Sequence, residues 1–273
     1  MHRLALILVA LGTGCASERA PAPDDLNGLT RFMFTHWESE KEISDGMTNL
    51  QIWLDGEGRT EEAQDDGFRL GALSEEDVGE ITFPGETPLS DLIGVAVSYE
   101  SPWSIEDHAA LVTEPDQRWN AARKYEKFDR VITEGATDAF LAEGAHEVPE
   151  FIRTDNDIIQ ERLGVRIAYT LLKDYRWTET DEGNRAVVAR TWAPERGCSG
   201  SDGDGNNCVE LSFSVDLIVE DDDGETMRFT ASWTKLSLSV NLGEDLQVAT
   251  LANGIRNIFE DTDELLEERS NGE

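Results

Sequence analysis

Residues 165–240 alternate between apolar and polar side chains through four successive stretches, and this pattern constrains the fold more than any other feature of the chain. In the clearest stretch, apolar residues occupy every second position: Val209, Leu211, Phe213, Val215, Leu217 and Val219. A period of two is typical of a β-strand with one buried face. The four stretches are 165–177, 185–192, 209–219 and 227–233. With short turns at 181–184 and 221–224, they predict an antiparallel meander.

A helical pattern follows the last predicted strand. From Glu244 onward, apolar or small residues recur at helical spacing: Val248, Leu251, Ile255, Ile258, Phe259, Thr262, Leu265 and Leu266. An antiparallel sheet with one apolar face needs a cover, so we expect this helix to lie across the meander. Near Lys235 the strand alternation changes phase, which predicts a β-bulge there.

The first half of the chain is predicted to be mainly helical. Ile43, Met47, Leu50 and Leu54 share one helical face, which predicts a helix over 38–55. A second helix is expected over 104–112, with Ser104 as its cap, and a short strand over 94–99. The mixed pattern from 117 to 163 favours helical pieces. The predicted fold class is therefore α+β: an antiparallel meander of four or more strands covered by a long C-terminal helix, with a helical N-terminal half.

The order of elements over residues 94–270 resembles the helix-grip fold of START-like ligand carriers. In that fold a curved sheet wraps a long terminal helix around an apolar cavity, so the resemblance implies a carrier of an apolar ligand. Six aromatic residues of the predicted strands are candidates either for the cavity wall or for an ordinary core: Tyr169, Tyr175, Trp177, Phe213, Phe229 and Trp233.

The first fifteen residues form a second informative segment. A short basic start at 1–3 is followed by an apolar run at 4–11 and by small residues up to Cys15. The apolar run is too short to span a membrane, and the pattern is typical of a secretory signal peptide. We therefore expect residues 1–14 to be removed after export.

This segment resembles the signal of bacterial lipoproteins, in which a small residue precedes a cysteine that receives lipid. Gly14 and Cys15 match that pattern, whereas Gly12 stands where the family usually has leucine. The resemblance implies a lipid anchor on Cys15, and Ala16 after it implies sorting to the outer membrane of the bacterial cell envelope. An ordinary signal peptide with an incidental cysteine is the alternative.

These patterns divide the chain into three parts: a signal peptide at 1–14, a lipid anchor and flexible spacer at 15–26, and a single α+β domain at 27–273. The domain is long enough for one large core. The expected partners are the membrane, through the anchor, and a protein of the envelope.

The chain carries 57 acidic against 23 basic residues, a formal net charge of −34, spread along its whole length. Direct nucleic-acid binding is disfavoured, and no nucleic-acid partner is expected, because affinity for phosphates comes from clusters of Lys and Arg. A surface adapted to salty water is favoured over a nucleic-acid mimic or an acidic interaction surface, since salt screens the self-repulsion. We expect the stability to fall when salt is removed.

Cys198 and Cys208 remain as a pair once Cys15 is assigned to lipid, and export permits a disulfide between them. Between them, Asp202, Asp204 and Asn206 alternate as in the opening of a calcium-binding loop. The later positions lack the glycine and the glutamate that such a loop requires. A disulfide-closed turn is therefore favoured, with a Ca²⁺ site as the alternative.

The sequence contains no recognisable catalytic or phosphate-binding motif, and no cofactor is predicted. The local cluster of titratable groups is 106–108, but successive helical residues point about 100° apart, which favours surface or cap positions. Arg190 shares strand parity with apolar residues, so it either points inward toward an anion or extends to an edge. A binding or structural role in a tethered lipoprotein is the leading hypothesis. The alternatives are the carrier and an envelope hydrolase that uses His108 or His146.

Overall fold

The computed structural model describes residues 20–119, 125–142, 144–145, 151–162, 165–200, 205–221, 225–239 and 243–272. The predicted signal peptide and Cys15 lie outside the described residues, as do His146, Asp202 and Asp204. Among the described helices, none is long and apolar enough to cross a membrane.

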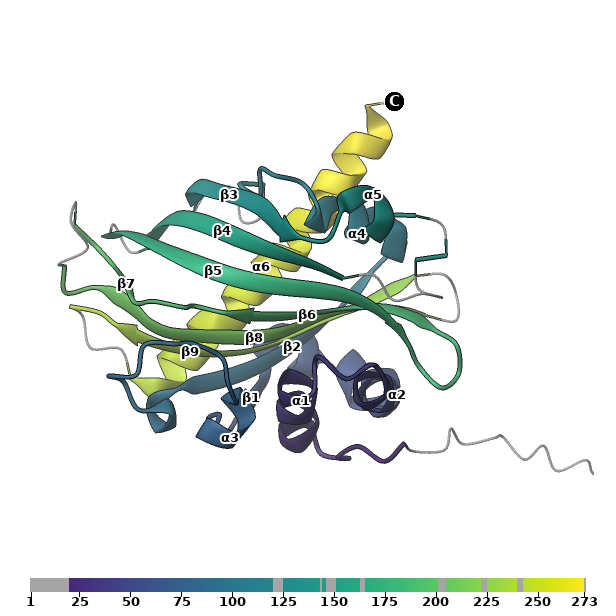
Figure 1. The fold of residues 1–273 in the computed structure, drawn as a ribbon, viewed down its shortest axis with the longest axis horizontal. Helices are drawn as coiled ribbons and strands as arrows, with labels where there is room; N and C mark the ends of the chain where they lie inside the picture. The colour runs from purple at the N-terminus through teal and green to yellow at the C-terminus, as the bar shows by residue number, and fades with distance from the viewer. Residues whose placement is uncertain are drawn as a thin grey trace, which may run out of the picture.

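The described part of the chain forms one antiparallel sheet of nine strands (Figure 1). The strands are β1 (Phe68–Leu70), β2 (Ile93–Ser101), β3 (Tyr125–Glu134), β4 (Phe151–Arg162), β5 (Val165–Glu179), β6 (Arg185–Trp192), β7 (Gly197–Cys198), β8 (Cys208–Glu220) and β9 (Thr226–Ser237). Their order is β1-β2-β9-β8-β6-β5-β4-β3, with β7 paired to β8. The helices are α1 (Leu26–Thr35), α2 (Glu40–Gly56), α3 (Glu75–Val78), α4 (Ile105–Val112), α5 (Thr137–Phe140) and α6 (Glu244–Asn271), with single turns η1 (Glu57–Arg59), η2 (Glu62–Asp66) and η3 (Leu89–Asp91).

The predicted elements with a strong period are confirmed. The four alternating stretches are β5, β6, β8 and β9, and the predicted helices at 38–55 and 104–112 are α2 and α4. The expected bulge lies beside Lys235, but the additional residue is Glu210 of β8, because Val209 pairs with Leu236 and Leu211 with Lys235. The predicted fold class, an antiparallel sheet with a long C-terminal helix and N-terminal helices, is therefore confirmed.

The expectation of helical pieces between 117 and 163 is wrong. The described residues of this region form β3 and β4, and only the short α5 is helical. Polar side chains hide the strand pattern, because Thr154 and Asn156 of β4 are both buried at positions where an apolar residue would have revealed the alternation. The N-terminal half therefore contributes strands to the same sheet as well as helices.

The main apolar core lies on one face of the sheet, and the N-terminal helices cover it (Figure 1). On this face Phe213 of β8 and Trp233 of β9 are buried against Phe34 of α1, with ring centroids 5.8 and 6.1 Å from the Phe34 ring. Helix α2 packs on α1 at Gly46, where an added Cβ would lie 2.8 Å from the Met33 side chain. Close contact between the two helices therefore requires glycine at that position.

Helix α6 lies across the opposite face, which we call the cavity face. It packs on β2, where Val95 and Val97 contact Ile255 and Phe259. The prediction that the C-terminal helix crosses the sheet is confirmed, but most apolar residues of β8 and β9 point away from it, whereas those of β5, such as Leu171, face it. The residues between the apolar ones on β8 and β9, such as Ser214, face α6 instead, because α1 and α2 already cover the apolar side.

The described chain begins on the surface of α2. The side-chain oxygen of Asn49 accepts a hydrogen bond from the Ala20 backbone N–H at 2.8 Å, and its amide donates to the carbonyls of Ala20 and Ala22. Residues 20–23 of the predicted spacer are thus attached to the body.

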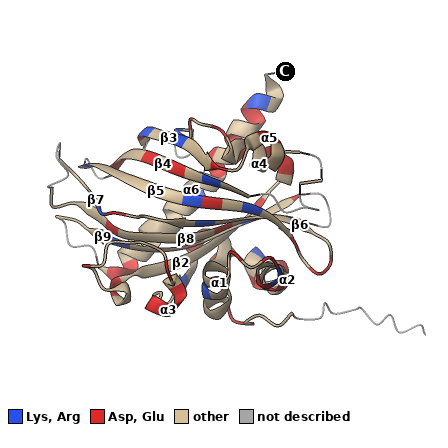
Figure 2. Ribbon diagram, in the orientation of Figure 1, with Lys and Arg blue, Asp and Glu red and all other residues tan. Residues whose placement is uncertain are grey.

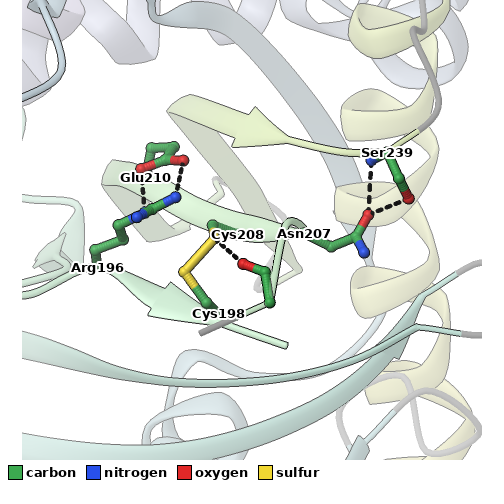
Figure 3. The surroundings of a disulfide bond; sticks show 7 residues. Arg196, Cys198, Asn207, Cys208, Glu210 and Ser239 are labelled. Carbon is green, nitrogen blue, oxygen red and sulfur yellow. Dashed lines mark hydrogen bonds and ion pairs between the residues drawn. A yellow bond between two sulfur atoms is a disulfide. The ribbon is translucent and has the colours of Figure 1, made fainter. Parts of the chain in front are cut away.

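Cys198 and Cys208 form a disulfide that joins β7 to the start of β8 (Figure 3). Beside it, Arg196 donates to Glu210 at 2.8 Å, and the Asn207 side chain accepts two hydrogen bonds from Ser239. The predicted pairing of the two cysteines is confirmed. Of the three residues in the calcium hypothesis, the structure describes Asn206. The two aspartates, Asp202 and Asp204, lie outside the described residues, so the Ca²⁺ site stays a prediction.

We expect the Cys198→Ser variant to lose about 2–3 kcal/mol of unfolding free energy, because the disulfide closes a short loop in the unfolded chain. Urea denaturation of the oxidised protein and the variant measures this difference. Reducing agent should lower the stability of the wild-type protein equally and leave the variant unchanged. Equal stability of the oxidised protein and the variant would contradict the expectation.

Candidate ligand-binding cavity

A cavity of about 270 Å³ lies between the cavity face of the sheet and α6. Residues of β3, β4, β5, β6, β8 and β9 form its floor and sides, and α6 covers it with Leu251, Gly254, Ile255, Ile258 and Phe259. Figure 1 shows α6 crossing the sheet diagonally. The helix packs directly on β2, and the cavity lies between the helix and the other strands.

A row of polar residues runs across the middle of the cavity floor. Lys173 of β5 lies opposite Thr191 of β6, Thr191 lies opposite Ser214 of β8, and Ser214 lies opposite Ser232 of β9. Residues directly opposite one another on neighbouring strands share a face of the sheet. Small hydroxyl side chains therefore occupy positions where larger apolar residues would fill the space under α6.

One end of the cavity is apolar. It is formed where β9 ends and β8 begins, by Val209, Leu236 and Leu238, and by Leu251 of α6. The bulge at Glu210 matters here because it reverses the alternation of β8 and brings Val209 to the cavity face, whereas Leu211 stays in the core on the other side. The cavity thus changes along its length from apolar to polar.

Lys173 and Asp216 form an ion pair in the polar middle, with Nζ 2.7 Å from Oδ2. Asp216 also accepts a hydrogen bond from the Thr230 hydroxyl at 2.7 Å and from Ser214 at 3.1 Å. Burial opposes both charges, but the attraction between them outweighs it, raising the pKa of Lys173 and, with the hydroxyl hydrogen bonds, lowering the pKa of Asp216. Both groups are therefore charged at neutral pH.

Arg130 reaches the cavity from β3. Its Nε donates to the Asn156 side chain at 2.7 Å, another nitrogen donates to the Val112 carbonyl, and the guanidinium lies over the Tyr175 ring at 5.3 Å. Burial lowers the pKa of Arg130. A guanidinium nevertheless keeps its proton in proteins, so Arg130 is a cation. This arginine is held in place by protein groups on several sides.

Arg228 lies at the other end of the cavity from the apolar residues, at the start of β9. Only 9% of it is exposed, and its guanidinium stacks on the Phe259 ring at 4.4 Å. One nitrogen donates to the Phe259 carbonyl at 3.3 Å, whereas Nε has no hydrogen-bond partner among the described residues. Burial lowers the pKa of Arg228 to about 10, which leaves it charged at neutral pH.

The cluster predicted at 106–108 does not converge. Asp107 caps the α4 N-terminus with Ser104, Glu106 pairs with Arg185, and His108 points into the protein. His108 Nε2 lies 2.9 Å from the Ser101 hydroxyl, which donates to Asp263 at 2.7 Å. A hydroxyl between imidazole and carboxylate is not the order in which a carboxylate orients a catalytic histidine.

The described residues contain no other histidine in a position that supports the hydrolase hypothesis. His36 lies at the surface, 3.2 Å from Glu42, and neither it nor His108 lines the cavity. Within the described ranges, no group of three His, Cys, Asp or Glu residues is arranged to hold a metal ion.

Burial lowers the pKa of His108 to about 2, and this predicts acid sensitivity. The unfolded chain binds a proton on this histidine below about pH 6.5 and the folded chain does not, so stability falls as the pH drops. Between pH 7 and pH 5 we expect the wild-type protein to lose about 2 kcal/mol more than a His108→Gln variant. Urea denaturation at both pH values tests this, and parallel losses in the two proteins would contradict it.

Arg190 takes the first of the two positions expected for it, pointing inward toward an anion. It is buried on the face covered by α1 and α2, where its guanidinium lies 3.4 Å from Asp174 and 3.3 Å from Glu38. It stacks on Trp37, 5.2 Å from the ring centroid. The anion that it meets is therefore a carboxylate of the same chain, and it is not a cavity residue.

The six candidate aromatics divide between wall and core. Tyr169 and Tyr175 line the cavity, whereas Trp177 is buried beside it and donates to the Phe140 carbonyl at 2.8 Å. The other three, Phe213, Phe229 and Trp233, belong to the core under α1 and α2. Lys173, Asp216, Arg130 and Arg228 were not predicted as site residues. Lys173 gave a signal, because it is in phase with Leu171 and Tyr175 in the alternating pattern.

No protein-family model matches this chain, and no curated protein does. Solved structures with a similar arrangement include human StAR-related lipid transfer protein 5, with 9% identity and a TM-score of 0.43 over 88% of this chain and 100% of that one. A STAR-related lipid transfer protein fragment from Xanthomonas axonopodis has 10% identity and a TM-score of 0.41 over 65% of this chain and 87% of that one. Likeness at this level carries no argument about ligand or activity.

Proposed function

We propose that this protein binds a small molecule in the cavity between the sheet and α6, and that it serves as a carrier or receptor for that molecule. The observation that carries the proposal is the cavity itself. Small hydroxyl residues such as Ser214 and Ser232 face a helix that bears Leu251 and Ile255, so the two surfaces do not fill the space between them. Unfilled space costs stability, and a ligand that occupies it recovers that cost.

The composition of the lining argues against the wholly apolar ligand that the helix-grip resemblance implies. A hydrocarbon over Lys173, Asp216 and Arg228 would remove water from charged groups without replacing its hydrogen bonds. A molecule with an apolar part near Val209 and Leu236 and a polar part in the middle fits both regions. The proposed ligand is therefore amphipathic.

A neutral fluorescent probe, N-phenyl-1-naphthylamine, tests the proposal, because its emission rises when it leaves water. We expect saturable binding of one probe per chain. Gly254→Leu and Ser232→Phe add side chains to opposite walls of the cavity and should each weaken binding at least tenfold. Gly254→Leu replaces glycine with a better helix former in the interior of α6, so the substitution should not weaken the helix.

Val131→Phe is the matched control, because Val131 is 60% exposed and is not among the cavity residues. This variant adds an aromatic ring outside the cavity and should bind the probe as the wild-type protein does. No saturable binding, or equal binding by wild type, Gly254→Leu and Ser232→Phe, would overturn the proposed function.

We also propose that the body is tethered to a membrane of the bacterial envelope through lipid on Cys15. The signal-like segment before Cys15 supports this, and the body begins soon after it, because Ala20 is already bound to Asn49. The test is fractionation of cells that express the full chain. Wild-type protein should sediment with membranes and Cys15→Ala should be released, whereas retention of Cys15→Ala in membranes would argue against the anchor.

A further inference from the structure

Arg228 has hydrogen-bonding capacity that the described structure does not use. A guanidinium carries five N–H donors, and the hydrogen bond to the Phe259 carbonyl employs one of them. Nε is buried without a partner, and no carboxylate of the described residues lies within ion-pair distance of the side chain. Buried polar groups are almost always hydrogen-bonded, so this arginine lacks a partner that its surroundings require.

The nearest acidic groups are already engaged. Asp216 accepts from Lys173, Thr230 and Ser214. Asp263 on α6 accepts from Ser101, and burial raises its pKa. These carboxylates attract Arg228 through space, as Tyr99 would in its ionised form. Within the described structure, however, neither carboxylate accepts a hydrogen bond from Arg228.

The other buried arginines provide the comparison. Arg130, in the same cavity, donates to Asn156 and to Val112. Arg190, on the opposite face, is paired with Asp174 and Glu38. Arg228 therefore differs from both in having neither a carboxylate nor a side-chain acceptor of its own.

The charges that line the cavity are positive in sum. Lys173 and Asp216 neutralise each other, and Arg130 and Arg228 remain. This positive lining lies inside a chain whose formal net charge is −34 (Figure 2), where acidic residues occur on helices and strands alike. A buried positive region favours a ligand with a negative group, since the low dielectric strengthens the attraction.

We propose that the ligand is an anionic amphiphile: a carboxylate or similar oxyanion bound by Arg228, with an apolar chain that extends under α6 toward Val209, Leu236 and Leu251. This rests on the proposed function and adds the chemical class of the ligand. Arginine presents paired donors that match the two oxygens of a carboxylate. Arg228 lies near the start of β9, and the apolar residues lie where β9 ends and β8 begins. A ligand aligned with these strands would therefore place its head at Arg228 and its chain among the apolar residues.

Three ten-carbon probes that differ only in the head group test this proposal: decanoate, decanol and decylammonium. Each is titrated against wild-type protein loaded with N-phenyl-1-naphthylamine. We expect decanoate to displace the probe at least tenfold more tightly than decanol, and decylammonium to bind more weakly than decanol. Arg228→Met should remove the preference for decanoate while leaving decanol unchanged, and Arg228→Lys should retain part of it.

Arg166→Gln is the control, because Arg166 is half-exposed, pairs with Glu126 and is absent from the cavity lining. It should keep the full preference for decanoate. Equal affinities for the three probes, a preference for decylammonium, or an unchanged preference in Arg228→Met would overturn the anionic head group and leave the binding function intact. Failure of all three probes to bind would overturn the function as well.

Discussion

Replacing Asp216 with alanine should lower the free energy of unfolding by about 3 kcal/mol at pH 7, because it leaves the Lys173 ammonium under α6 without its counter-charge. The expected loss lies at the lower end of the range for broken buried ion pairs, since the two side chains retain 20% and 25% of their accessible surface. Three hydroxyls, those of Thr230, Ser214 and Thr191, also lose their acceptor. Urea denaturation measures the loss.

The double variant Lys173→Met with Asp216→Leu is the control for this prediction. It removes both charges together, and replacing a buried pair with apolar residues of similar volume is often neutral or stabilising. We expect it to recover most of the stability that Asp216→Ala loses. A single variant as stable as the wild-type protein would show that Lys173 does not depend on Asp216.

The second large effect is expected at Phe34 of α1. Phe34→Ala should cost about 3–5 kcal/mol, because the fully buried ring contacts Phe213 and Trp233 and its removal leaves a cavity in the core. Phe32→Ala on the same helix is the matched control. Phe32 is only partly buried and stacks on His36, so we expect a loss of about 1 kcal/mol there.

These two variants test which helices cover the apolar face of the sheet. If α1 covers it, Phe34→Ala is much more damaging than Phe32→Ala in thermal or urea denaturation. Similar small losses in both variants would mean that the N-terminal helices are not part of the main core.

The sequence predicted β8 and β9 well because each has one face in the apolar core under α1 and α2. Phe213, Val215 and Leu217 alternate with polar residues because every second side chain of β8 points into that core. The alternation of β5 has another origin, because its apolar residues, such as Leu171, line the cavity. The alternation does not say which helices lie on the core. From their patterns alone, the apolar stripe of α6 could pack directly on the apolar face of β8 and β9. In the structure it does not, because α1 and α2 occupy that face.

The cavity was less predictable for a related physical reason. On β8 and β9 its floor is made mainly of the polar alternates, such as Ser214, Asp216 and Ser232, which an alternating pattern assigns to solvent. The same effect concealed β4, whose Thr154 and Asn156 are buried. Lys173 was the visible exception, as a charged residue in phase with the apolar residues of its strand. Buried polar positions of this kind mark the site, and periodicity alone does not separate them from surface positions.

The central claim is that one small molecule occupies the cavity under α6, and native mass spectrometry of the protein with N-phenyl-1-naphthylamine tests it most directly. We predict a single added ligand mass per chain in the wild-type protein and in Val131→Phe, and none in Gly254→Leu under the same conditions. A wild-type spectrum without the added mass, or the same added mass in Gly254→Leu, would contradict the claim.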